Sequence, residues 1–263
     1  MSKHLIIGVP AYAGTVKLAT FKALLTDCTT LAIGGWDIEI VDTISGAEID
    51  TIRNKLISYL ASHEKATELI MVDHDVCWSH NDLLRLLAVP LDGNPSIVGG
   101  VYPKRMDPIE YPFMPMMDDH MQPLYDPDLH MMRCEHIPGG FMRIPKFTAQ
   151  SIIDAGIVKP YAQVFNKIEP KGYTCYSFCE KIWQYNEATG ENHRLSEDIS
   201  FCKRVLEAGG EVYAHPDIPM AHIGDKMWCG SKLRGNSARH SDASNAPGGD
   251  HSLGGSSAGE AVE

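Results

Sequence analysis

The chain has 263 residues, of which 44% are hydrophobic and 22% are charged, an ordinary composition for a globular protein with a large core. Its formal net charge of -11 argues against a broad nucleic-acid-binding surface, because such a surface needs clustered lysine and arginine. The charge does not exclude a nucleotide, whose phosphates can be handled through a metal ion.

The first residues lead directly into a strand-like run, without the basic-then-apolar order of a signal peptide. No apolar stretch approaches the roughly 20 residues that span a bilayer. We therefore expect a cytoplasmic protein, in the host cytoplasm if it is viral. A zinc site could be imagined from Cys175, Cys179, Cys202 and His222, but the spacing is poor, and reduced, half-buried thiols are favoured for all seven cysteines.

The first hundred residues alternate between strand-like and helix-like segments. Strands are predicted at 5–10, 36–43, 68–75 and 96–102, and helices at 16–33, 49–60 and 79–87. This alternation predicts an α/β fold with a mostly parallel sheet that is covered on both faces.

The character of the sequence changes at Pro103. Residues 103–138 are rich in Pro, Met, Asp and His, and their apolar residues follow neither the helical nor the strand period. This predicts an irregular excursion, a long loop that passes over the carboxyl edge of the sheet. Ordered structure is predicted again at 137–144, with helices at 147–155 and 196–208 and short strands at 211–214 and 220–224; the aromatic-rich residues 157–194 have no clear assignment. Residues 234–263 offer almost nothing to bury, which predicts a disordered tail.

The strand predicted at 68–75 ends in two carboxylates, Asp73 and Asp75. In an extended segment side chains i and i+2 point the same way, so both would face one point at the strand's carboxyl end, where ligand sites of open α/β sheets lie. Two hard carboxylates suit an oxygen-preferring divalent ion that carries a phosphorylated ligand. The alternative is that one Asp caps the helix near Ser79 and the other is solvated.

The order of these parts resembles the nucleotide-sugar glycosyltransferases of the GT-A fold, and is similar to family 2-type enzymes and to small viral, phage or bacterial members. The resemblance covers roughly residues 5–224 and depends on several short motifs in order. It implies a GT-A type, Rossmann-like, mostly parallel sheet with flanking helices and a smaller antiparallel sheet on the acceptor side. It also implies one domain over 1–233, with a nucleotide-binding half at about 1–103 and an acceptor-side half at about 104–233.

The resemblance suggests where the donor binds. Pro10 and Tyr12 belong to a first-strand loop similar to the one that touches base and ribose, and Asp42 matches an acidic residue that hydrogen-bonds the base. Arg53-Asn54 resembles an Ala-Arg-Asn element, with Ile52 in the Ala place, and an Arg fork suits a diphosphate. The plainer alternatives are a strand–helix turn, a cap at Asp42 and a surface pair on a helix.

Two further motifs follow the fourth strand. Lys104 or Arg105 could neutralise a phosphate or grip the acceptor, unless they are a solvated basic pair. Gly139-Gly140 resembles the glycine pair that lines the sugar pocket, where a side chain would block close backbone approach; a hairpin bend is the alternative.

The resemblance also suggests a metal site and a catalytic motif. Asp73-His74-Asp75 stands at the family's Asp-X-Asp motif, which implies that Asp75 binds the metal and that Asp73 contacts the ribose or the metal's water. His222 fits the later histidine of the metal shell, and its nitrogen would favour Mn²⁺ over Mg²⁺. Ser196-Glu197-Asp198 resembles the Glu-Asp motif, whose Asp is the general base, although a Ser N-cap with acids in the first turn is also a plain helix start.

These implications together predict a metal-dependent glycosyltransferase that moves a hexosyl or related sugar from a UDP- or GDP-sugar to an acceptor hydroxyl, with inversion. A retaining outcome stays open, because fold does not set stereochemistry. A nucleotidyltransferase is a second hypothesis, although residues 11–15 lack the basic residue of its usual loop. A non-catalytic nucleotide- or carbohydrate-binding module is a third. Long nucleic acid is disfavoured as the acceptor by the acidic charge, whereas a modified base is not excluded.

Overall fold

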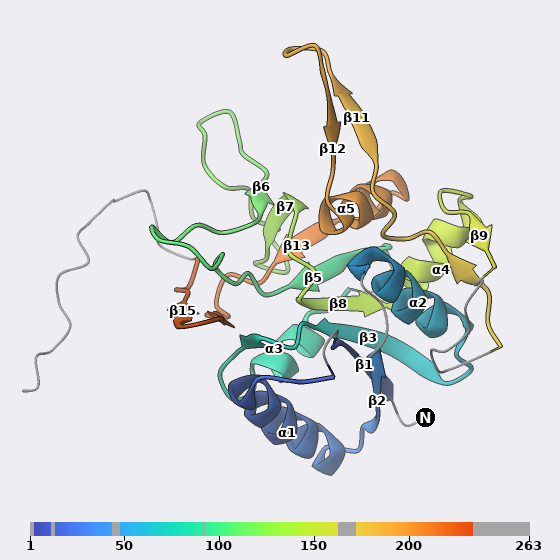
Figure 1. Ribbon diagram of the computed structural model, residues 1–263, viewed down its shortest axis with the longest axis vertical. Helices are drawn as coiled ribbons and strands as arrows, with labels where there is room; N and C mark the ends of the chain where they lie inside the picture. The colour runs from blue at the N-terminus through green and yellow to red at the C-terminus, as the bar shows by residue number, and fades with distance from the viewer. Residues whose placement is uncertain (1–2, 12–13, 44–47, 92, 163–171, 234–263) are drawn as a thin grey trace, which may run out of the picture.

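The computed structural model describes residues 3–11, 14–43, 48–91, 93–162 and 172–233, so Tyr12 and the predicted tail at 234–263 lie outside the described residues. A sheet of eight strands crosses the molecule in the order β2-β1-β3-β8-β5-β13-β7-β6 (Figure 1). Its strands are β1 (His4–Pro10), β2 (Asp37–Thr43), β3 (Ala66–Val72), β5 (Ile97–Gly99), β6 (Met114–Pro115), β7 (Met132–His136), β8 (Phe141–Pro145) and β13 (Val212–Ala214).

Most strands of this described sheet run in one direction. β1 pairs in parallel with β2 and β3, and β5 pairs in parallel with β13. β8 is antiparallel to both β3 and β5, and β7 is antiparallel to both β13 and β6, so these two strands oppose the other six. The predicted α/β fold with a mostly parallel sheet is confirmed.

Helices cover both faces of the sheet. The described helices are α1 (Leu18–Ile33), α2 (Ile49–Ser62), α3 (Asp82–Ala88), α4 (Lys146–Asp154) and α5 (Glu197–Glu207). Side chains of α2, α4 and α5 form one buried cluster, and side chains of α1 and α3 belong to another. Alternate residues of β3 enter different clusters: Leu69 and Met71 face α2, whereas Ile70 and Val72 face α1 and α3. Burial on both faces explains why β3 is a continuous apolar run.

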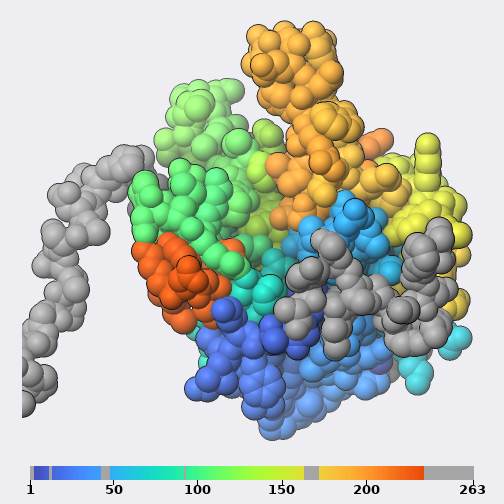
Figure 2. Space-filling model, in the orientation of Figure 1, coloured from blue at the N-terminus to red at the C-terminus, as the bar shows by residue number. Residues whose placement is uncertain are grey.

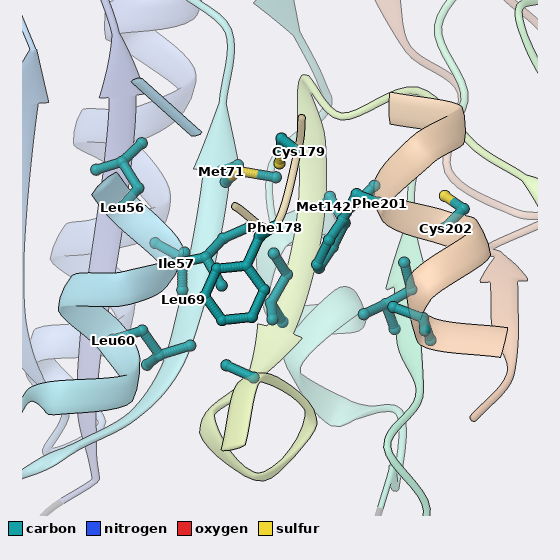
Figure 3. Packing of buried hydrophobic residues seen from close by; sticks show 14 of the residues in the cluster. Leu56, Ile57, Leu60, Leu69, Met71, Met142, Phe178, Cys179, Phe201 and Cys202 are labelled. Atoms are coloured by element: carbon teal, nitrogen blue, oxygen red, sulfur yellow. The ribbon is translucent and has the colours of Figure 1, made fainter. Parts of the chain in front are cut away.

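The larger cluster joins the amino-terminal and carboxyl-terminal halves of the chain. Figure 3 shows Leu60 of α2 directed toward β3, with Phe178 between α2 and α5. Phe178 meets Phe201 of α5 edge-on, with ring centroids 6.4 Å apart. Residues more than a hundred positions apart therefore share one core, which holds the start of α5 against the sheet.

Three small antiparallel sheets lie outside the large one. β4 (Val76–Cys77), β14 (Ala221–Ile223) and β15 (Met227–Cys229) form a three-stranded sheet, and the two pairs are β9 (Pro160–Tyr161) with β10 (Cys175–Tyr176) and β11 (Trp183–Asn186) with β12 (Glu191–Arg194). The predicted smaller antiparallel structure is therefore present. β4 begins four residues after β3 ends, so the chain leaves the large sheet and enters the three-stranded one within a single turn.

That turn corrects the expected geometry of the acidic pair. β3 ends at Val72, and His74 and Asp75 lie in the turn, so the strand does not extend to residue 75. The i and i+2 argument therefore fails here, because pairing of β4 with β14 draws the chain away from the direction of β3. As a result Asp73 and Asp75 make separate contacts.

Other boundaries also differ from the prediction. Residues 103–138 contain two strands, β6 and β7. In β7, Met132 and Cys134 are buried and Arg133 is only partly buried, an alternation that could have predicted this strand from the sequence. The fourth strand shortens to residues 97–99. The helix predicted from Ser79 begins at Asp82, because Asn81 takes a left-handed conformation with φ of 71°.

None of the seven cysteines, all of which lie in the described ranges, forms a disulfide. Burial, the largest influence, raises the pKa of Cys134, Cys179 and Cys202 to about 12, so these thiols are protonated and inert at neutral pH. The zinc combination does not form among the described residues. Nor does any helix in the described ranges have both the length and the apolar composition for crossing a bilayer.

Candidate functional site

Polar groups from four parts of the chain meet at the carboxyl end of β3. Asp73 directly follows β3, Gly140 directly precedes β8, and Tyr102 lies three residues after β5. The backbone N–H of Asp73 donates to the carbonyl oxygen of Gly140 at 2.9 Å. The opening of α5 supplies Glu197 and Asp198, with Ser196 as its N-cap; the Ser196 hydroxyl accepts from the N–H of Ile199 at 3.4 Å.

Arg53 of α2 is the cation that these carboxylates share. Its Nη1 lies 3.2 Å from Oε1 of Glu197 and in direct contact with Oδ1 of Asp198. Its Nη2 lies 3.2 Å from Oδ1 and 3.3 Å from Oδ2 of Asp73. One guanidinium thus ties the end of β3 to the first turn of α5.

The charge of Arg53 is held firmly although the residue is only 3% exposed. Burial by itself would lower the pKa of Arg53, but the negative charges of Asp73 and Glu197 raise it above its ordinary value. Both terminal nitrogens are engaged, so the structure leaves neither free for a diphosphate. The contacts of Arg53 are thus with Asp73, Glu197 and Asp198, whose side chains it holds together.

The glycine pair allows this close packing. A Cβ on Gly139 would lie 2.6 Å from Nη1 of Arg53 and 2.7 Å from Oδ1 of Asp198, and a Cβ on Gly140 would overlap the carboxylate of Asp73. No side chain fits at either position without displacing the charged cluster. The pair is therefore required by the carboxylate cluster itself.

A second group of side chains forms around Asp75. Its carboxylate is buried, at 4% exposure for the residue, and Oδ1 lies 3.6 Å from Nε2 of His222 in β14. The register that pairs His222 with Val76 brings the two side chains together, and the N–H of Ile223 donates to the Asp75 carbonyl at 2.8 Å.

Hydrogen bonding determines the tautomer of His222. Its Nδ1 lies 2.9 Å from the carbonyl oxygen of Pro103, and because a carbonyl can only accept, Nδ1 carries the proton. Burial, the largest influence, lowers the pKa of His222, and Arg105 acts in the same direction. The ring is therefore neutral at pH 7, with its Nε2 lone pair toward Asp75, as a metal ligand requires.

Arg105 is the basic residue that reaches this group. Its guanidinium contacts Oδ2 of Asp75, whereas Nζ of Lys104 lies 3.0 Å from Oε2 of exposed Glu110. Of the basic pair, Lys104 is thus turned to a surface partner, and Arg105 supplies the positive charge at the site.

Tyr102 connects the two groups, and the motifs did not identify it. Its hydroxyl donates to Oδ2 of Asp73 at 3.2 Å and accepts from the N–H of Gly140 at 3.2 Å. Its ring meets that of His222 edge-on, with centroids 5.0 Å apart. Burial and then Asp73 raise the pKa of Tyr102, so it stays a donor. An aromatic residue just past the fourth strand was the available signal.

The remaining predicted residues lie elsewhere. Asp42, near the end of β2, lines a cavity of about 700 Å³ between α1 and β2. Most of its other lining residues are apolar side chains of these two elements, and Val9, Ala11 and Gly14 also line it. Pro10 ends β1 and is buried. Asn54 is buried and its Oδ1 accepts from the N–H of Cys179 at 2.6 Å, which anchors the chain near Phe178.

The donor set at Asp75 fits a divalent ion that is completed by non-protein oxygens. A buried carboxylate and an imidazole nitrogen lie 3.6 Å apart, and phosphate or water would supply the other ligands. Asp73 is not close enough to both atoms to join them as a third ligand. Among the described residues, only His4, Glu39 and His63 bring three candidate ligand atoms within 4.8 Å of one another.

That other group is better explained by hydrogen bonding. Nδ1 of His63 accepts from the N–H groups of Lys65 and Ala66, at 3.1 and 2.8 Å. The proton of neutral His63 must then sit on Nε2, which lies 3.4 Å from Oε2 of Glu39. A metal there would need a fully deprotonated ring.

Comparisons with known proteins give only a distant likeness. No protein-family model matches the sequence, and no curated protein matches it. The crystal structure of A197 from STIV aligns with a TM-score of 0.49 and 13% identity, over 92% of this chain and 100% of that one. A crystal structure of GalNAc-T7 with UDP, GalNAc and Mn²⁺ aligns with a TM-score of 0.43 and 10% identity, over 85% of this chain and 44% of that one. Both TM-scores are below 0.5, so the functional argument depends on the side chains above.

Proposed function

We propose that the protein is a metal-dependent glycosyltransferase that moves a sugar from a UDP- or GDP-sugar to an acceptor hydroxyl, with inversion. The observation that carries the proposal is the convergence of two groups through Tyr102: a buried carboxylate with a neutral imidazole, and a carboxylate cluster at the start of α5. The first group suits a cation, and the second offers a base. The described parts of residues 1–233 would act as one catalytic domain.

Asp75 and His222 are the residues that would hold the ion. When bound, Mn²⁺ or Mg²⁺ supplies Lewis-acid stabilisation of the charge on the departing diphosphate. The neutral tautomer of His222 and the burial of Asp75 are the features of this chain that prepare the site. Arg105 contacts the same carboxylate. When the ion and the diphosphate bind, the ion would replace Arg105 as the partner of Asp75.

Asp198 is the proposed general base. Its carboxylate would accept the proton of the acceptor hydroxyl while that oxygen attacks the anomeric carbon, and the bond from that carbon to the diphosphate oxygen would break. The side chain keeps 22% of its surface exposed, and Arg53 fixes its direction. Glu197 shares the same guanidinium and would help to hold it.

The donor would lie along the carboxyl edge of β1, β2 and β3. Asp42 and the cavity beside it would receive the base next to Val9 and Ala11. Asp73 would contact the ribose, and Gly139-Gly140 would let the charged cluster pack closely beside the sugar. Lys104, paired with Glu110 on the surface, would act only if that pair opened.

A thermal-shift screen of UDP, GDP and their sugars tests the donor site with and without MnCl₂. A ligand at about 100 times its Kd stabilises the folded state by about 2.7 kcal/mol, which for a chain of this size raises Tm by roughly 5–10 °C. We expect this shift only with metal, and we expect Asp75→Asn to lose it while Glu110→Gln keeps it. Absence of any metal-dependent shift in the wild type would refute the proposal.

An assay of nucleotide release separates the alternatives. A transferase releases UDP or GDP from the bound donor, slowly with water and faster with acceptor. A binding module would show the thermal shift without release. A nucleotidyltransferase would instead consume a nucleoside triphosphate and release pyrophosphate.

A further inference from the structure

The hairpin formed by β11 and β12 stands apart from the body of the molecule (Figure 1). In the space-filling view its residues form a projection beyond the rest of the described chain (Figure 2). All four residues of β12 and three of the four in β11 are exposed. A two-stranded hairpin is barely stable by itself, so this element has no evident part in the core.

One face of the hairpin carries its aromatic side chains. Trp183 and Tyr185 are two residues apart on β11 and so point to the same side; they are 66% and 59% exposed. The register places Arg194 opposite Trp183 and Asn192 opposite Tyr185. Cζ of Arg194 lies 6.0 Å from the centre of the Trp183 ring. Two flat apolar rings are thus flanked by hydrogen-bonding groups. We call these four residues the aromatic face.

The base of the hairpin is fixed to the proposed catalytic turn. The N–H of Leu195 donates to the carbonyl of Ile182 at 2.9 Å, and the N–H of Ile182 donates to the Ser200 hydroxyl of α5 at 3.0 Å. Arg194 precedes Asp198 by four residues, so their Cα atoms are at most about 14 Å apart. A chain of a few sugar rings would cover that distance.

We propose that the aromatic face binds the acceptor, and that the acceptor is an uncharged oligosaccharide chain. This inference depends on the proposed function. Sugar rings present flat C–H faces that stack on Trp and Tyr, and the Asn and Arg side chains offer donors for their hydroxyl groups.

The charge of the hairpin favours this occupant over nucleic acid. Residues 183–194 contain two glutamates and one arginine, a formal charge of -1, where a phosphate backbone would need an excess of cations. Nζ of Lys181, just before the hairpin, is already paired with Asp50 at 3.0 Å.

Binding to the complete chain tests the inference without any need for catalysis. The probes are maltohexaose, cellohexaose, mannohexaose and chitohexaose, with single-stranded dT20 as the nucleic-acid arm, and the readouts are tryptophan fluorescence and saturation-transfer NMR. We expect at least one oligosaccharide to bind and dT20 not to bind. Trp183→Ala should weaken that binding about tenfold, the loss of roughly one aromatic stacking contact.

Matched variants separate a lost contact from a lost hairpin. Trp183→Phe keeps a flat ring and should bind within about threefold of wild type. The double variant Gln184→Ala, His193→Ala changes a cross-strand pair on the opposite face and should bind normally. Equal weakening on both faces, wild-type binding by Trp183→Ala, or binding of dT20 in place of every oligosaccharide would overturn the inference.

The two proposals can fail separately. A metal-dependent thermal shift with nucleotide-sugars, without any oligosaccharide binding, would leave the donor site standing and remove the acceptor face. Oligosaccharide binding without any metal-dependent shift by nucleotide-sugars would support the aromatic face as a binding surface and refute the proposed donor site.

Discussion

Arg53 is one buried cation among three carboxylates from two distant parts of the chain. Removing one partner of such a buried group costs about 3–5 kcal/mol, because the remaining charges lose their compensation. The same arrangement limits where the Asp198 carboxylate can point, which is what a general base requires. Positioning of the base and stability of the fold are therefore linked at this residue.

Asp198→Asn keeps the shape of the side chain and removes the basic oxygen. We expect transfer to fall by about 10²- to 10⁴-fold, with the metal-dependent thermal shift by UDP or GDP retained. Glu197→Gln, the neighbouring change on the same guanidinium, should have a smaller effect on kcat. Unchanged turnover in Asp198→Asn would exclude it as the base.

Arg105→Ala removes the cation that contacts Asp75. The carboxylate would then meet a divalent ion without a competing charge, so we expect saturation of the UDP-dependent thermal shift at a several-fold lower MnCl₂ concentration. Lys104→Ala is the matched control, because Lys104 is paired with Glu110. A higher MnCl₂ requirement in Arg105→Ala would mean that Arg105 binds the diphosphate.

At the scale of elements, the excursion after β5 is anchored by Asp126. Its Oδ1 accepts from the N–H groups of Asp128 and Leu129 at 3.1 and 2.9 Å, and its Oδ2 accepts from Arg133 at 3.0 Å and from the Tyr213 hydroxyl at 3.1 Å. This one carboxylate joins the loop to β7 and to β13 of the large sheet. This segment, in which the sequence shows no hydrophobic periodicity, is thus ordered by side-chain contacts together with backbone hydrogen bonds, such as that from the N–H of Arg133 to the carbonyl of Leu124 at 2.9 Å.

These contacts predict a dependence of stability on pH. The hydrogen bond from Leu129, followed by those from Arg133 and Asp128, lowers the pKa of Asp126 from 3.8 to about 2. Because the pKa of Asp126 is lower in the folded protein than in the unfolded chain, the ionised carboxylate stabilises the fold at any pH above its unfolded-state pKa of 3.8. This stabilisation is lost as the pH falls toward the folded-state pKa of about 2. It amounts to about 2 kcal/mol at neutral pH.

Asp126→Asn should therefore be less stable than wild type at pH 7 in urea unfolding, and the difference should narrow from pH 5 to pH 3. Asp154→Asn, on the exposed end of α4, is the control and should show little difference at either pH. If the difference in unfolding free energy between wild type and Asp126→Asn stayed constant with pH, the role assigned to this carboxylate would be contradicted.

At the scale of the whole molecule, one sheet separates two cores, and strands such as β3 contribute to both. The amino-terminal strands and the later strands β8, β5 and β13 belong to the same sheet. Neither the nucleotide-side half nor the acceptor-side half suggested by the motifs has a core of its own. We therefore expect the two faces to unfold together.

Leu56→Ala on α2 and Leu86→Ala on α3 each leave a cavity in a different core, at side chains that are almost fully buried. Each should lower the free energy of unfolding by about 2–5 kcal/mol and leave a single transition by near- and far-ultraviolet circular dichroism. Ile33→Ala, at a residue that is 84% exposed, should change it by no more than about 0.5 kcal/mol. Separate transitions for the two probes would mean that the cores are independent.

The sequence by itself determined the α/β class, the five helices and the long amino-terminal strands, because continuous apolar runs and helical stripes are local signals. It also singled out Asp73, Asp75, His222 and Asp198 through short motifs. Only the tertiary structure decided how these residues combine. The turn after Val72 divides the acidic pair, Tyr102 joins its halves, and Arg53 faces carboxylates in place of solvent. Such contacts come from side chains up to 145 positions apart, and nothing local in the sequence records which distant groups a fold will bring to one place.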